Sequence, residues 1–159
     1  MKIQKNDFDI ATLEDEIRVD ALCRELLLIF YEETVAAGTD PVVATELARS
    51  TDYFVRDFLV DRLQRNIFAE TPGTVRRFAG NWYIVTTSEP SPAEVAHHLA
   101  GVRAFYRFLT GKGLISPDYL AVVEVECSLL DYYAIRIDSF WQISGDGFRE
   151  WDQECPLQG

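Results

Sequence analysis

Glu94 and His97 have the residue types and the spacing to bind a metal ion. They are three residues apart, so on a helix both side chains project from one face, as in helical di-iron sites. Those sites need a second copy of the motif, and the only other histidine of the chain is His98. We therefore expect both histidines to face solvent on an exposed helical side, and we predict no metal site.

A second set of side chains could present carboxylates to a hard cation. Asp52, Asp57 and Asp61 follow one another at spacings of five and four, which places them along one helix. Arg56 and Arg62 are interleaved with them. This pattern favours a solvated face on which the acids and the arginines form ion pairs.

The cysteines are candidate nucleophiles, but their surroundings argue against that role. Cys23 and Cys127 lie in apolar helical stretches, where a thiol usually serves as a small core residue. Together with Cys155 they are odd in number and far apart, which suits free thiols in a reducing compartment. No set of residues points to catalysis or to a cofactor, so we predict that the protein is not an enzyme.

The middle of this acidic chain contains its one basic stretch. Residues 62–112 hold seven bases against three acids, whereas residues 1–50 and 111–159 each carry a net charge of −6. The candidate contacts for phosphate groups or for a partner are Arg76, Arg77, Arg103 and Arg107. The alternative is neutralisation in ordinary surface pairs. The acids expected to form those pairs are Glu94, Asp57 and Asp61.

Aromatic residues crowd into residues 132–151, and they are more than one face of one helix can bury. They are Tyr132, Tyr133, Phe140, Trp141, Phe148 and Trp151. One interpretation is that the tail folds back and covers the core. The other is a binding surface for a protein partner or a second copy, since Trp and Tyr are favoured at interfaces. From their number we predict a homodimer or a stable partner complex.

Helical periodicity dominates the sequence and determines where these groups lie. The clearest helix starts pair a capping residue with proline, at Asp40-Pro41, Ser91-Pro92 and Ser116-Pro117. The expected helices cover residues 13–37, 41–65, 74–85, 92–110, 118–136 and 148–154. The apolar stripe of the first comprises Leu13, Ile17, Ala21, Leu22, Leu26, Ile29 and Phe30.

These elements predict an all-α fold of five to six helices in orthogonal or bundle-like packing. Residues 78–87 are rich in β-branched and aromatic residues, so one short hairpin is allowed there. We expect a single domain over residues 1–159. Within it, residues 144–159 form a tail that packs on or near the core.

Composition and charge exclude several classes of protein. The 159 residues are 48% hydrophobic and carry a formal net charge of −11, which is typical of a soluble, well-packed chain. Such a charge disfavours binding to nucleic acid or to an anionic membrane. No segment reaches the roughly 18 apolar residues of a membrane span, and residues 1–7 are not followed by the apolar region of a signal peptide. We expect a cytoplasmic protein without a membrane partner.

Short motifs within residues 57–115 resemble a known family. They are Asp57-Phe58-Leu59, the segment 71–78, and Val102 to Leu109 with Gly113-Leu114-Ile115 after it. They look like the N-terminal core-binding (SAM-like) domain of tyrosine recombinases, the phage integrases, whose equivalent helix reads Arg-x-Phe-Tyr-x-Phe-Leu before a Gly-Leu-Ile turn. The resemblance implies a four-helix domain that clamps DNA. The Arg, His-x-x-Arg and Tyr set of the family's catalytic domain is absent from this sequence.

Two classes of function follow from these patterns. The first is a non-catalytic helical module that binds a protein partner or itself through its aromatic surface. The second is a DNA-associated module that keeps a recombinase-like clamp and contacts phosphates through the four arginines.

Overall fold

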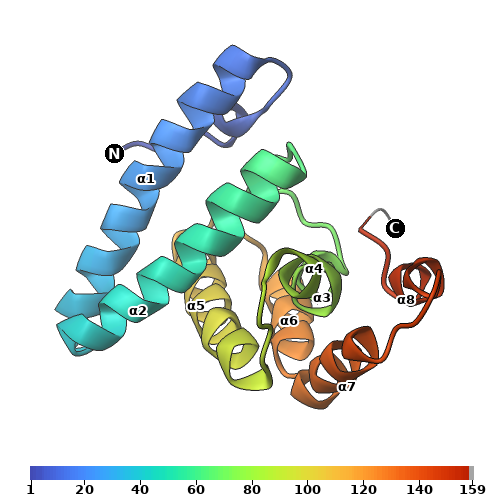
Figure 1. Ribbon diagram of the computed structural model, residues 1–159. Helices are drawn as coiled ribbons and strands as arrows, with labels where there is room; N and C mark the ends of the chain where they lie inside the picture. Colours follow the sequence, from blue (N-terminus) through green and yellow to red (C-terminus); the bar gives the residue numbers. More distant parts are fainter. Residues whose placement is uncertain (158–159) are drawn as a thin grey trace.

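The fold is all-α, as the sequence predicts (Figure 1). The structure is a computed structural model that describes residues 1–157, and no strand occurs in that part of the chain. The long elements are α1 (Leu13–Ala36), α2 (Pro41–Asp52), α5 (Pro92–Gly111), α6 (Pro117–Cys127) and α7 (Leu130–Trp141). The short ones are η1 (Lys5–Phe8), η2 (Tyr53–Arg62), α3 (Thr74–Arg77), η3 (Phe78–Trp82), α4 (Tyr83–Thr86) and α8 (Phe148–Gln153).

The hairpin allowed at residues 78–87 is wrong, because η3 and α4 are helical there. η3 continues α3, and η2 continues α2; both are π-helices. Their aromatic side chains meet, with ring centroids 5.0 Å apart for Phe54 and Phe78 and 5.3 Å apart for Phe58 and Trp82. This core packing outweighs the local preference of β-branched and aromatic residues for strands.

The three proline-bearing helix starts are where the sequence places them. The side chains of Asp40, Ser91 and Ser116 accept hydrogen bonds from the backbone N–H groups of Val42, Glu94 and Tyr119. Each satisfies one of the amides that the first turn leaves without a partner in the helix.

Replacing either capping serine by alanine is therefore expected to lower the free energy of unfolding by about 1 kcal/mol. Ser88→Ala is the matched control, because Ser88 is exposed and precedes no helix. Chemical denaturation of Ser91→Ala, Ser116→Ala and the control measures the difference. Equal stabilities for all three would contradict this account of the caps.

The predicted helix over residues 118–136 is broken in two. α6 ends at Cys127 and α7 begins at Leu130. At the break the Ser128 hydroxyl donates to the Val125 carbonyl, and the Tyr133 hydroxyl donates to the Glu126 carbonyl. Side chains thus satisfy carbonyl groups that a continuous helix would have bonded internally.

Helices α2 and α5 pack together most closely at Gly101. A Cβ at this position would lie 2.7 Å from the Leu47 carbonyl oxygen and 2.8 Å from the Ser50 Cβ. The Thr51 hydroxyl also donates to the Gly101 carbonyl at 3.0 Å. Only glycine allows this approach without moving one of the helices.

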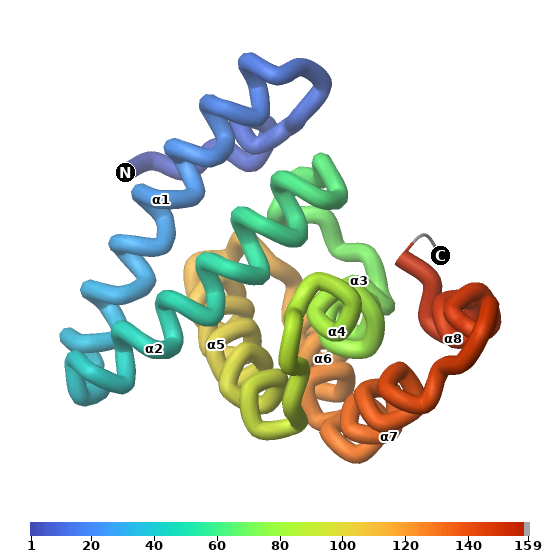
Figure 2. Tube along the Cα trace, viewed as in Figure 1, coloured from blue at the N-terminus to red at the C-terminus, as the bar shows by residue number. Residues whose placement is uncertain are grey.

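The buried face of α1 differs from the apolar stripe in its sequence. α1 runs antiparallel to the rod formed by α2 and η2, at the edge of the molecule (Figures 1 and 2). It buries Val19, Cys23, Leu26, Leu27 and Phe30. Leu26 and Phe30 belong to the predicted stripe, whereas Leu13 is 71% exposed and Ile17 is 65% exposed. The helix therefore has a second apolar face that points outward.

None of the helices within residues 1–157 is long and apolar enough to cross a membrane.

Candidate interaction surfaces

The C-terminal segment is fixed to the rest of the protein by a buried arginine. Arg136 is only 2% exposed, and its Nε donates to the Gly80 carbonyl at 2.8 Å. Its Nη1 donates to the Trp151 carbonyl at 2.7 Å, and its guanidinium lies 3.8 Å from the centroid of the Trp151 ring. The Trp151 indole N–H in turn donates to the Arg136 carbonyl. α7 and α8 are thus joined by reciprocal polar contacts.

Asn81 adds a second attachment of the tail. Its side-chain amide donates to the Cys155 carbonyl and to the Asp152 carboxylate, both at 2.8 Å. The Cys155 thiol contacts the Arg76 carbonyl at 3.6 Å. α3 and η3 therefore contact residues 152–155 of the tail.

The six C-terminal aromatic residues fall into two groups. Tyr133 and Trp151 are buried within their own chain. Trp141 is 59% exposed and Phe148 is 43% exposed. Tyr132 and Phe140 are half-buried. The buried residues thus fit a tail that covers the core. The exposed Trp141 and Phe148 are the residues available for a binding surface.

Trp141 continues an apolar stripe along α7. Leu130, Ala134, Ile137 and Trp141 follow one another at spacings of four, three and four, which places them on one side of the helix. Ile137 is buried at the inner edge of this stripe, while the other three reach the surface. We call Leu130, Ala134, Trp141 and Phe148 the C-terminal aromatic surface.

Two of the four candidate arginines share one acid. Arg107 makes two hydrogen bonds to the Glu124 carboxylate, at 2.6 and 3.0 Å. The Nε of Arg103 lies 3.8 Å from the same carboxylate. The Arg107 guanidinium lowers the pKa of Glu124. Arg103 and Arg107 thus pair with an acid, as the alternative interpretation expected. The acid is Glu124 of α6, and not Glu94, Asp57 or Asp61.

The other two arginines lie on α3. Arg76 is exposed, and Arg77 makes one long contact, 3.5 Å, to the Pro72 carbonyl. The short helix that carries them is held from inside by Glu126, a buried residue of α6. Its carboxylate accepts the backbone N–H groups of Gly73 and Arg76 at 2.9 and 2.8 Å. Glu126 of α6 therefore caps α3, because the N-cap residue Gly73 has no side chain that could do so.

Glu94, the first residue of the candidate metal motif, accepts a hydrogen bond from the Tyr83 hydroxyl at 2.6 Å. Within residues 1–157, no group of three potential ligands lies close enough together to hold a metal ion. His97 is exposed as expected, but His98 is half-buried, 5.0 Å from the Tyr53 ring between centroids. Burial lowers the pKa of His98.

The structural roles of Glu126 and Arg136 were not predicted from the sequence. Each is a charged residue between two apolar neighbours, in Val-Glu-Cys and in Ile-Arg-Ile. Charged side chains are seldom buried unless they are hydrogen-bonded. A charged residue in an apolar run is therefore a signal of a buried structural hydrogen bond. Glu124 lies two residues before Glu126 on another face of the helix and is not buried, so the signal alone does not separate the two.

Two hollows in the surface also escaped prediction. The larger, about 700 Å³, lies between α2 and α5, and Val43, Leu47, Ser50 and His97 are among its lining residues. Val43 is exposed at this hollow. The smaller, about 310 Å³, lies between α1 and η2.

No protein-family model, curated protein or solved structure matches this chain. The resemblance of residues 57–115 to recombinase core-binding domains therefore rests on the short motifs alone. Its phosphate-contacting residues include Arg103 and Arg107, which Glu124 already engages. The function has to be argued from the surfaces of the chain itself.

Proposed function

We propose that this protein is a non-catalytic protein-interaction module that associates with a second copy through the C-terminal aromatic surface. The observation that carries the proposal is the exposure of Trp141, at 59%, next to a segment whose other tryptophan is buried. An exposed tryptophan costs free energy in water and is among the residues that contribute most to protein interfaces.

Trp141 and Phe148 each have an aromatic neighbour within their own chain. Trp151 packs against Phe140 and Phe148, with ring centroids 5.0 and 5.9 Å apart, and the Phe140 ring lies 6.3 Å from that of Trp141. Arg136 holds Trp151 in place. Because these groups are already fixed, binding through them costs little additional side-chain entropy.

The spacing along α7 fits pairing with an identical helix. Leu130, Ala134 and Trp141 lie along one side, so two copies related by a twofold axis can bring these stripes together. Asp131 and Asp138 are exposed on the same helix and would repel their counterparts. Association is therefore expected to become stronger as salt screens this repulsion.

The test is sedimentation equilibrium of the wild type and of Trp141→Ser/Phe148→Ser. We expect a dimer whose dissociation constant rises at least about tenfold in the double variant, since truncating one such anchor commonly costs about 2 kcal/mol. Val42→Ser/Val85→Ser is the matched control, because both valines are exposed on other helices. A wild type that stays monomeric at high concentration, or a control that dissociates equally, would contradict the proposal.

A DNA-associated role is the weaker alternative. It depends on Arg76 and Arg77, because Arg103 and Arg107 share the Glu124 carboxylate. The net charge of −11 opposes binding to a polyanion.

A further inference from the structure

The outward face of α1 carries a long apolar stripe. Leu13, Ile17, Ala21 and Leu28 are all exposed, at 71%, 65% and 56% for the three larger residues. Their spacings of four, four and seven place them on one side of the helix, where the exposed Arg24 lies between Ala21 and Leu28. At 1.5 Å per residue the stripe is about 22 Å long, enough to lie against several turns of another helix.

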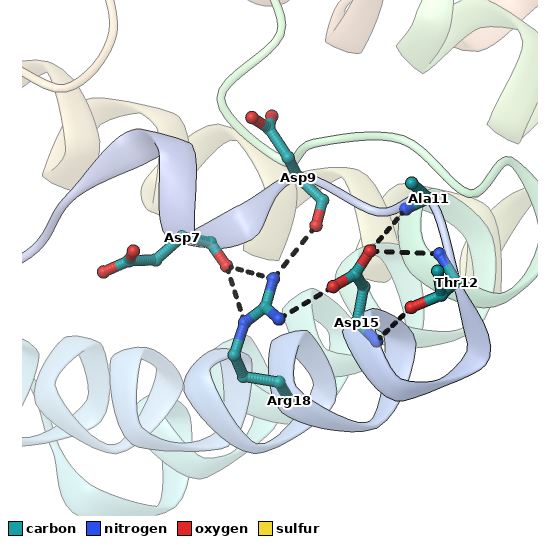
Figure 3. A network of polar contacts seen from close by, with 6 residues as sticks. All are labelled: Asp7, Asp9, Ala11, Thr12, Asp15 and Arg18. Atoms are coloured by element: carbon teal, nitrogen blue, oxygen red, sulfur yellow. Dashed lines mark hydrogen bonds and ion pairs between the residues drawn. The ribbon is translucent and has the colours of Figure 1, made fainter.

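At its N-terminal end the stripe opens into the hollow between α1 and η2. Leu13 and Ile17 form one wall of this hollow, and Val60 contributes from η2. The turn before α1 is held by the network in Figure 3, in which Arg18 donates to the carbonyl groups of Asp7 and Asp9 and to the Asp15 carboxylate. The wall that carries Leu13 is therefore fixed in place.

Apart from Arg56, the rest of the hollow is lined by carboxylates. Glu16 and Asp20 come from α1, and Asp57 and Asp61 come from η2. Together with Leu13, Ile17 and Val60 they form what we call the acidic groove.

The arginines near the acidic groove already form ion pairs. Arg56, the base that lines it, is bound to Asp20 at 2.8 Å and to Asp52 at 2.9 Å. Arg24 also contacts Asp20, at 3.3 Å. Among residues 1–157, no cation pairs with Glu16, Asp57 or Asp61.

The carboxylates repel one another, and Arg56, which offsets part of the charge of Asp57, is already bound to Asp20 and Asp52. Burial and the neighbouring Asp52 raise the pKa of Asp57. A bound cation would stabilise the ionised form of Asp57. A second copy of the chain is a poor occupant, since it would bring Glu16, Asp57 and Asp61 against their equivalents.

We propose that the acidic groove and the α1 stripe bind a basic amphipathic helix of another protein. Apolar residues of that helix would cover Leu13 and Ile17, while its lysine or arginine side chains would face Asp57 and Asp61. This is helix-in-groove recognition, in which apolar anchors give affinity and flanking charges select the partner. The surface and the kind of partner both differ from those of the proposed self-association.

The test uses a fluorescent helical peptide of about 18 residues, or five turns, built of leucine and lysine with leucines three and four apart. Its counterpart has glutamate in place of lysine. We expect the lysine peptide to bind and the glutamate peptide not to bind, as measured by fluorescence anisotropy. Raising the salt from about 50 to about 300 mM should weaken the lysine complex, whereas it should strengthen self-association.

Variants then locate the binding site. Asp57→Asn/Asp61→Asn should weaken binding at least about tenfold, because two close charge pairs are lost. Glu89→Gln/Asp146→Asn removes the same charge from exposed residues of the loops before α5 and α8 and should leave binding within about twofold. If both double variants weaken binding equally, the peptide is attracted to the acidic protein in general, and the proposal is overturned.

The apolar part of the site needs its own comparison. Leu13→Ser/Ile17→Ser should weaken binding to a similar extent, whereas Val42→Ser/Val85→Ser should not. All four side chains are exposed, so circular dichroism should show unchanged folding. If the Leu13 and Ile17 variant binds like the wild type, the groove does not dock a helix and the proposal fails.

Discussion

Replacing Arg136 by alanine is expected to lower the free energy of unfolding by about 3–5 kcal/mol, because two buried carbonyl groups lose their donor and the Trp151 ring loses its packing partner. The carbonyl groups belong to Gly80 and Trp151, which lie in η3 and α8. Each one left unpaired costs about 1–3 kcal/mol. Urea denaturation followed by tryptophan fluorescence measures the change.

Arg149→Ala is the control for this experiment. Arg149 is exposed on α8, so its loss should change stability by no more than about 0.5 kcal/mol. Arg136→Lys should fall between the two, because a lysine has no planar fork with which to reach both carbonyl groups. If Arg136→Ala and Arg149→Ala unfold at the same urea concentration, Arg136 does not hold the tail.

The second large effect is expected for Glu126→Ala, at about 2–4 kcal/mol. The N–H groups of Gly73 and Arg76 would lose their acceptor at the start of α3, and each costs about 1–3 kcal/mol when unpaired. Glu126→Gln should cost less, since its amide oxygen can still accept one of the two hydrogen bonds.

Glu124→Ala is the matched control on the same helix. It removes only the partly exposed ion pairs with Arg103 and Arg107, each of which is worth less than about 1 kcal/mol. Thermal or urea denaturation of the three variants gives the comparison. A Glu126→Ala protein as stable as Glu124→Ala would show that water replaces the lost acceptor.

Local rules predicted the helix starts and failed where distant contacts decide. Ser91 and Ser116 cap their helices through atoms three residues away, so the signal is contained in a short segment. The arginine pairs are different, because Glu124 is 17 residues from Arg107 along the chain. Nothing local distinguishes Glu124 from the acids that were expected, and only the packing of α5 against α6 does.

The sequence also did not determine which face of a helix is buried. α1 is apolar on two sides, so the 3.6-residue period is satisfied by either, and the sequence cannot show that Leu13 and Ile17 lie outside. The same holds for Trp141 and Trp151. Both have aromatic neighbours in the sequence, but only Trp151 has a buried arginine against its ring. The candidate surfaces therefore became visible only with the tertiary structure.

The placement of the thiols gives this chain internal reporters of local opening. Cys23, Cys127 and Cys155 are all buried and free, and they lie in α1, at the end of α6 and in the tail. Burial raises the pKa of Cys23 and of Cys127 to about 12, so neither is reactive at neutral pH in the closed state. A thiol reagent can reach each sulfur only when its own region opens. The rates at which the three become labelled therefore rank the regions by how readily each detaches from the native fold.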